Sequence, residues 1–260
     1  MRISCIQMDI AFGDPDVNYR RAETLIRAAI ADHPDVLVLP ELWTTGYDLG
    51  RLPEIADLHC ADTRAFLSAM ALAHNVHIVG GSVAVKTAAG ITNTMLVYNR
   101  QGQPTGEYSK PHLFRPMEEH RHLIPGDQPG LFTLDGISCA GVICYDIRFP
   151  EWTRKHAVLG AEVLFVSAEW PLEREAHWRA LLAARAIENQ CYVAACNRSG
   201  SDPSCAFAGR SMIIGPWGDT LAEAGESEEI ITAEIDLSRV HAIRRDIPIL
   251  ADRRPDLYRE

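Results

Sequence analysis

Residues 141–151 read Gly141-Val142-Ile143-Cys144-Tyr145-Asp146-Ile147-Arg148-Phe149-Pro150-Glu151. The small and β-branched residues from Ile137 to Ile143 predict a buried strand, and the polar turn and Pro150 after them predict the start of a helix. Cys144 is therefore expected where a strand ends and a helix begins. Such strand ends are where α/β folds place ligands, because the N–H groups of neighbouring helix termini favour negative charge.

Cys144 alone has two interpretations. A thiol at a strand end can be a nucleophile whose thiolate is stabilised locally. Free cysteine is also among the most buried residue types, so a structural cysteine is the simpler interpretation. Other residues must decide between the two.

The composition predicts one soluble globular domain. The chain has 260 residues and a formal net charge of −10, which argues against nucleic-acid and anionic-membrane partners. Its seven cysteines form no Cys-x-x-Cys pair and do not resemble a secreted disulfide framework. No signal-like or membrane-spanning apolar segment is evident, so we expect a cytoplasmic protein with a single domain over residues 1–260.

The apolar periodicity predicts alternating strands and helices. A strand at residues 2–8, a helix at 17–31 and a strand at 36–39 predict a β-α-β opening with parallel strands. Further elements are expected as a helix at 63–74, a strand at 77–85, an antiparallel hairpin from 92–98 and 107–110, a helix at 151–159, a strand at 163–166, a helix at 176–189, strands at 192–195 and 211–214, and a short strand pair at Leu221 and 230–235. The charged tail at 237–260 is expected to pack over the surface or against a partner subunit.

Three reactive residues follow predicted strands, namely Glu41, Lys110 and Cys144. If their strands share one sheet, their ends meet at a common rim. Singly, Glu41 could be a carboxylate that starts a helix, and Lys110 could be a surface lysine. Together the three residues provide a nucleophile, a base and a cation, which are the groups required for acyl transfer through a thioester.

The motifs around these residues resemble the three signatures of the nitrilase superfamily of carbon–nitrogen hydrolases. They read Leu-Pro-Glu-Leu at 39–42, Ser-Lys-Pro-His-Leu-Phe at 109–114 and Ile-Cys-Tyr-Asp-Ile-Arg-Phe-Pro-Glu at 143–151, in the chain order of that family. The resemblance continues through 176–178, 184–190, 209–211 and 216–218, so it covers nearly the whole chain.

This resemblance implies an α/β fold, a four-layer αββα sandwich, whose subunits pair through a helix layer into a homodimer or higher homo-oligomer. It implies that Cys144 is the nucleophile, Glu41 the general base and later acid, and Lys110 the stabiliser of the oxyanion, with the backbone N–H of Tyr145. A second glutamate is expected at Glu119, with Glu118 as the neighbouring alternative. The chemistry requires no metal and no other cofactor.

Within the family, residues 110–122 and 168–171 resemble the ω-amidase branch, which hydrolyses the terminal amide of 2-oxo dicarboxylic acid monoamides such as 2-oxoglutaramate. Such a small-molecule substrate carries a carboxylate that needs cationic or N–H partners. Arg115, Arg174 and Arg198 are the candidates, and they cannot be ranked from the sequence.

Three nearby residues have alternative interpretations. Arg148 is expected to form a structural ion pair beside the nucleophile. Trp170 is expected either to limit the pocket to short chains or to be a core aromatic. Tyr47 could donate a hydrogen bond to the substrate.

Glu118, Glu119, His120 and His122 superficially resemble a metal cluster, but their spacing matches no zinc or calcium pattern, so a solvated loop or active-site wall is expected.

Three functions therefore compete. The first is an ω-amidase. The second has the same chemistry on an aliphatic amide, an N-carbamoyl compound or a nitrile. The third is a non-catalytic scaffold on the same fold, which the intact Glu41, Lys110 and Cys144 disfavour.

Overall fold

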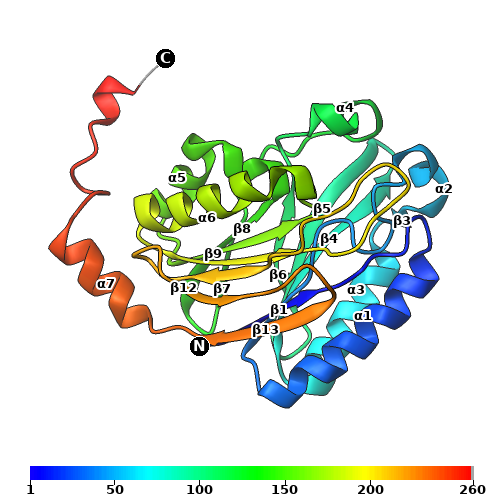
Figure 1. Ribbon diagram of the computed structural model, residues 1–260, viewed down its shortest axis with the longest axis horizontal. Coiled ribbons are helices and arrows are strands. Elements are labelled where there is room, and N and C mark those ends of the chain that lie inside the picture. The colour runs from blue at the N-terminus through cyan, green and yellow to red at the C-terminus, as the bar shows by residue number, and fades with distance from the viewer. Residues whose placement is uncertain (259–260) are drawn as a thin grey trace.

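The computed structural model describes residues 1–258, in which strands and helices alternate (Figure 1). The strands are β1 (Arg2–Gln7), β2 (Val36–Val38), β3 (Asp57–Leu58), β4 (His77–Thr87), β5 (Gly90–Tyr98), β6 (Pro104–Ser109), β7 (Leu131–Leu134), β8 (Ile137–Ile143), β9 (Val163–Ala168), β10 (Tyr192–Asn197), β11 (Met212–Ile214), β12 (Thr220–Glu223) and β13 (Glu229–Glu234). The α-helices are α1 (Pro15–Ala29), α2 (Leu52–Ile55), α3 (Ala61–His74), α4 (Glu119–His122), α5 (Pro150–Val158), α6 (Glu175–Asn189) and α7 (Leu237–Asp246).

The strands form two sheets. The first has the order β13-β1-β2-β4-β5-β6, with β3 paired to β4, and the second has the order β12-β11-β10-β9-β8-β7. Strands β1, β2 and β4 are parallel, as are β8, β9 and β10, which is the pairing that the β-α-β segments predict. Antiparallel strands complete each sheet.

The two sheets pack face to face with helices on the outside. In β2, Val36 and Val38 belong to the apolar core between the sheets, whereas the alternate residue Leu37 belongs to the core beneath α1 and α3. This alternation follows from the two-residue period of a strand. Figure 1 shows α1 and α3 outside one sheet, and α5 and α6 outside the other. The predicted αββα arrangement is confirmed.

Two predictions about the strands are wrong. Leu221 and residues 230–235 do not pair with each other, because β12 pairs with β11 in one sheet and β13 pairs with β1 in the other. The ends of β2, β6 and β8 do not share the rim of one sheet either. Strands β2 and β6 belong to the first sheet and β8 to the second, so the reactive residues meet across the sandwich.

The C-terminal tail begins with the helix α7, which the charged sequence did not reveal. Val240 and Ile243 are its buried residues, and the Arg244 guanidinium donates to the carbonyls of Ala161 and Gln190, so α7 packs on the body of its own chain. Residues 259–260 of the predicted tail lie outside the described residues. None of the helices within residues 1–258 is long and apolar enough to cross a membrane.

Candidate active site

Cys144 lies at the first turn after β8, and its backbone has a φ of 44°. This left-handed conformation is uncommon for a residue with a Cβ atom, and such strained residues are often found at functional sites. Asp146 holds the turn, since its Oδ2 accepts from the backbone N–H of Ile143 at 2.9 Å and from the Tyr108 hydroxyl at 2.6 Å. The turn thus keeps the thiol at a fixed place at the end of the strand.

Glu41 lies in the loop after β2, which packs closely against β4. Gly81 permits this approach, because it has a φ of +61° and a Cβ atom there would lie 2.1 Å from the Pro40 carbonyl oxygen. The neighbouring Ser82 donates its backbone N–H to the same carbonyl at 3.0 Å, and its hydroxyl accepts from the Leu42 N–H at 3.0 Å. These contacts turn the chain so that the Glu41 side chain is completely buried between the sheets.

Lys110 follows β6, and its ammonium group contacts two carboxylates. Its Nζ donates to Glu41 Oε1 and to Glu119 Oε1, both at 2.7 Å, and all three side chains are fully buried. Burial alone would lower the pKa of Lys110, but the charges of Glu119 and Glu41 outweigh it and hold this pKa well above its usual value. Lys110 therefore stays charged.

Of the two candidate glutamates, Glu119 contacts Lys110 and Glu118 points elsewhere. Glu119 Oε2 accepts from the Phe114 N–H at 2.7 Å, while Glu118 is exposed and pairs with Arg121 at 2.7 Å. The Tyr47 hydroxyl lies 2.5 Å from Glu119 Oε1 and 3.2 Å from Glu41 Oε1. Tyr47 thus bridges the two carboxylates, a contact that the sequence did not suggest.

Two further groups that the sequence did not reveal complete the hydrogen bonds of Glu41. The Asn93 side-chain amide donates to its Oε1 at 2.8 Å, and the Glu169 backbone N–H donates to its Oε2 at 2.9 Å. Asn93 lies within β5, where no local pattern marks it, and Glu169 follows β9 in the segment 168–171, whose resemblance to the ω-amidase branch did not indicate this contact. Both carboxylate oxygens of Glu41 therefore have partners.

The thiol of Cys144 is buried beside this cluster. Burial raises the pKa of Cys144 well above its ordinary value, and the Glu41 carboxylate raises it further while Lys110 opposes the shift. At neutral pH the resting side chain is therefore a thiol. For this thiol to attack a substrate, a neighbouring base would have to take its proton, and Glu41 is the nearby carboxylate whose charge acts most strongly on the thiol.

A small, tight cavity opens onto Cys144. Its wall is formed by Phe114, Cys144, Tyr145, Arg148, Glu169, Trp170, Pro171 and Arg174. A larger hollow beside it, which reaches Tyr47, shares Pro171 and Arg174 with the cavity wall. Trp170 is both a core residue and a wall residue, because it is 2% exposed and lines the cavity.

The arginines separate into two groups. Arg148 and Arg174 line the cavity, whereas Arg115 is exposed at a different hollow and Arg198 is fully buried against Glu169. The prediction of a structural ion pair for Arg148 is wrong. Within residues 1–258 no carboxylate pairs with Arg148, whose guanidinium carbon instead lies 4.6 Å from the centre of the Trp170 ring. A cation without a carboxylate partner thus faces the cavity.

The sequence matches the carbon-nitrogen hydrolase family over residues 2–245. The 2-oxoglutaramate amidase of Bacillus subtilis (strain 168) is 54% identical over 256 residues, which cover 98% of each chain. Omega-amidase YafV of Escherichia coli (strain B / BL21-DE3) is 34% identical over 97% of this chain and 96% of its own.

Among solved structures, an amidase of Nesterenkonia sp. AN1 superposes with a TM-score of 0.88 at 25% identity, covering 99% of this chain and 95% of that one. It belongs to the nitrilase superfamily, and a mutant of it carries the acetamide moiety of fluoroacetamide, covalently added at the active-site cysteine. The chain therefore belongs to the carbon–nitrogen hydrolases of the nitrilase superfamily, and it is a hydrolase that acts on amides.

Proposed function

We propose that this enzyme is an ω-amidase that hydrolyses 2-oxoglutaramate to 2-oxoglutarate and ammonia through a thioester on Cys144. The observation that carries the chemistry is the ammonium of Lys110, held 2.7 Å from both Glu41 and Glu119 beside the buried thiol. The substrate follows from the relatives, whose names are 2-oxoglutaramate amidase and omega-amidase, and from the arginines of the cavity wall.

In the first step Glu41 takes the thiol proton, and the sulfur attacks the amide carbon. The charge that develops on the amide oxygen is stabilised by the Lys110 ammonium and by the backbone N–H of Tyr145, and loss of one such donor costs roughly 3 kcal/mol. Glu41 then gives its proton to the departing ammonia. Water, deprotonated by Glu41, hydrolyses the thioester and frees the acid.

Arg148 would hold the carboxylate at the other end of the substrate. Its charge has no carboxylate partner among the described residues, and Arg174, which pairs with Glu173 at 2.7 Å, lies on the same wall. A guanidinium binds a carboxylate through two parallel N–H bonds. Trp170, stacked on Arg148, would close the cavity around a short chain.

The decisive experiment measures ammonia release from 2-oxoglutaramate, glutamine, an aliphatic amide, an N-carbamoyl amino acid and a nitrile. We expect fast turnover of 2-oxoglutaramate and none by Cys144→Ala, with the fold of the variant intact by circular dichroism. Cys139→Ala is the matched control, because it removes another buried thiol from β8, the strand that leads to Cys144. Turnover of another compound alone would refute the substrate, and an active Cys144→Ala variant would refute the nucleophile.

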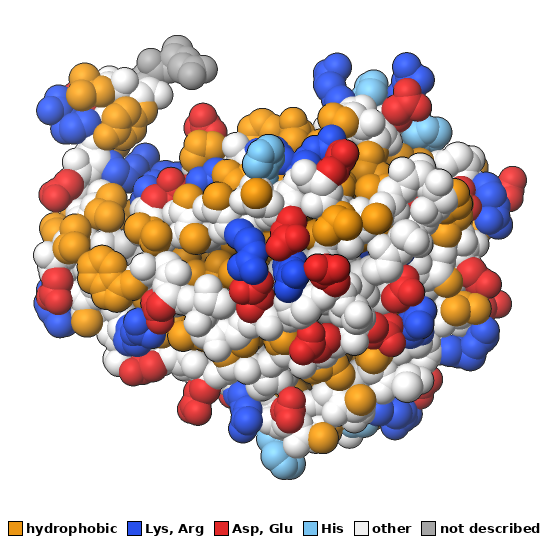
Figure 2. Space-filling model, viewed as in Figure 1, with side chains coloured by type: hydrophobic (Ala, Val, Ile, Leu, Met, Phe, Trp, Pro, Cys, Tyr) orange, Lys and Arg blue, Asp and Glu red, His pale blue; other side chains and the backbone are white. Residues whose placement is uncertain are grey.

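We also propose that two subunits associate through α5, α6 and the C-terminal segment. Val158, Leu159, Ile187 and Tyr258 are exposed there, between 46% and 60% of each residue, and a hollow separates α5 from the segment around Ile249. Figure 2 shows hydrophobic side chains gathered around this segment. A second copy of the chain would cover them. Light scattering of the purified protein tests this, and a monomer that does not change with concentration would refute it.

A further inference from the structure

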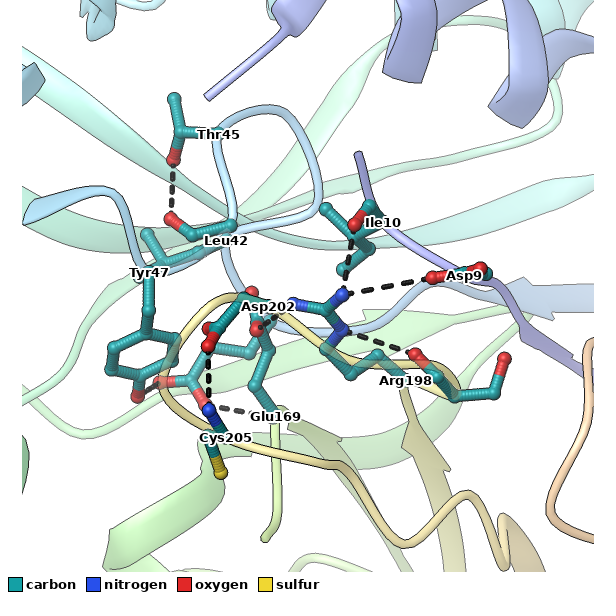
Figure 3. A network of polar contacts seen from close by, with 12 residues as sticks. Asp9, Ile10, Leu42, Thr45, Tyr47, Glu169, Arg198, Asp202 and Cys205 are labelled. Carbon is teal, nitrogen blue, oxygen red and sulfur yellow. Dashed lines mark hydrogen bonds and ion pairs between the residues drawn. The ribbon is translucent and has the colours of Figure 1, made fainter. Parts of the chain in front are cut away.

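Glu169 is a buried glutamate whose side chain the mechanism above does not use. It follows β9 directly, and it is 1% exposed. Its Oε2 accepts from Arg198 Nη1 at 2.7 Å, and Figure 3 shows the two side chains pointing toward each other. The pair lies between the loop that contains Tyr47 and the segment that contains Asp9 and Ile10 (Figure 3).

A structural role explains only one of the two carboxylate oxygens. Arg198 is held in place by the Ile10 carbonyl at 2.8 Å, by the Ser199 carbonyl at 3.2 Å and by the Phe207 ring, whose centre is 4.0 Å away. The guanidinium therefore fixes Oε2 and, with it, the direction of Oε1. Oε1 itself has no hydrogen-bond partner within residues 1–258.

Burying a carboxylate oxygen without a hydrogen-bond partner costs free energy, and this cost raises the pKa of Glu169. Burial raises its pKa to about 8, Arg198 opposes the shift, and the neighbouring charges of Glu41 and Asp202 add to it. A donor that reached Oε1 would stabilise the ionised form. Within the described residues the chain does not supply such a donor, so the donor must be a bound water or a ligand.

The position of Glu169 identifies the part of the substrate that could reach it. Its backbone N–H donates to Glu41 Oε2 at 2.9 Å, so it stands beside the base that handles the leaving nitrogen. It also lines the cavity with Cys144. The charges with the largest effects on its carboxyl group are those of Arg198, Glu41 and Asp202. Glu169 therefore lies at the amide end of the site.

We propose that Glu169 Oε1 accepts a hydrogen bond from an N–H of the scissile carboxamide and so selects amides over esters of the same acid. This inference rests on the proposed function in one respect, that Cys144 attacks a carbonyl in this cavity. A primary amide presents two N–H donors to the site. An ester presents none, and its alkoxy oxygen would meet the lone pairs of a buried carboxylate.

Glu169→Gln tests the proposal with little change of shape. Because a guanidinium can only donate hydrogen bonds, Arg198 would bind the amide oxygen of the substituted side chain in the way that it binds Oε2. The NH₂ group would then take the place of Oε1. At about pH 9, above the pKa of Glu169, the substitution therefore replaces an ionised acceptor with a donor, and all rates are compared at this pH. The two substrates are 2-oxoglutaramate and the 5-methyl ester of 2-oxoglutarate, which give the same thioester, so kcat/KM compares the acylation steps alone.

We expect kcat/KM for the amide to fall by about tenfold to a hundredfold, the range that a hydrogen bond to a charged group supports, and kcat/KM for the ester to change less than about threefold. Equal losses on both substrates would show a structural role and overturn the proposal, as would an unchanged amide rate. Glu118→Gln is the control, since it removes an exposed carboxylate from the adjacent hollow.

Glu169→Asp provides a second variant that keeps a charge for Arg198 but withdraws the carboxylate by one methylene group. Its amide-to-ester ratio should also fall, and thermal unfolding of both variants shows whether they fold. If wild-type enzyme does not hydrolyse 2-oxoglutaramate, the ratio is measured with the carboxamide that it does hydrolyse and the matching ester. Failure of the substrate assignment is thereby separated from failure of the Glu169 proposal.

Discussion

The two buried ionic groups of the active site differ in how completely their oxygens are paired. In the cluster of Glu41, Lys110 and Glu119, every carboxylate oxygen accepts at least one hydrogen bond from the chain. In the pair of Glu169 and Arg198, one carboxylate oxygen accepts none within residues 1–258. Both groups are almost fully removed from solvent, so exposure does not account for the difference.

The difference teaches what each group is built for. A fully paired cluster is organised before the substrate arrives, and it can stabilise a developing charge without rearrangement. A carboxylate with a free oxygen is held in place but is incomplete until a donor arrives. The first arrangement suits the reacting groups, and the second suits recognition of the substrate.

The largest expected effect comes from breaking the paired cluster at its centre. Lys110→Ala leaves two buried carboxylates without their cation, so we expect it to lower the free energy of unfolding by about 3–5 kcal/mol. It also removes the proposed donor to the oxyanion, which should lower kcat by about 10²–10³-fold in any protein that still folds. Urea denaturation and ammonia release measure the two effects, and normal turnover by this variant would refute the role of Lys110.

A smaller effect is expected for the pair of Glu169 and Arg198, whose contribution to stability depends on pH. The folded protein keeps the Glu169 proton until about pH 8, whereas the ordinary pKa of this side chain is 4.5, so raising the pH between these values favours unfolding. Glutamine does not titrate. Between about pH 6 and pH 8 the wild type should therefore lose roughly 2 kcal/mol of unfolding free energy relative to Glu169→Gln.

Urea denaturation of both proteins at the two pH values measures this gain. The exposed Glu118→Gln variant should stay close to the wild type in stability at both values, because surface substitutions usually change stability by less than about 0.5 kcal/mol. A constant difference between Glu169→Gln and wild type across this pH range would show that Glu169 is ionised throughout. In that case Glu169 Oε1 has a hydrogen-bond donor when the protein is in solution.

Much of the fold was predictable because its elements are marked by local periodicity. The strand before Cys144 and the helices α1, α3 and α6 lie within a few residues of their predicted bounds. The helix α7 was missed because only Val240 and Ile243 of its ten residues are buried, which leaves too weak an apolar stripe to detect. The separation of β12 and β13 into two sheets depends on the sandwich itself.

Three motifs marked Glu41, Lys110 and Cys144 as the candidate reacting residues, and the structure brings them together, but the motifs did not reveal their partners. Glu41 lies 69 residues and Glu119 9 residues from Lys110 in the sequence. Only the resemblance to a family associated these three residues. Glu169 meets Arg198 through an ion pair across 29 residues, and no spacing rule indicates such a pair. The sequence also suggested an ion pair for Arg148, because a charged side chain beside a buried turn usually pairs with an opposite charge.

The smallest expected effect concerns the hydroxyl that joins the two carboxylates of the paired cluster. Tyr47→Phe removes a group 2.5 Å from Glu119 and 3.2 Å from Glu41 but leaves Lys110 between them. We expect kcat/KM to fall about tenfold and the free energy of unfolding to fall by about 1 kcal/mol, the usual contribution of one hydrogen bond. Tyr19→Phe is the matched control, because its hydroxyl bonds Thr63 at 2.7 Å, away from the site. If Tyr47→Phe lost activity as completely as Lys110→Ala, the cluster would not be organised by Lys110 alone, and Tyr47 would itself act on the substrate.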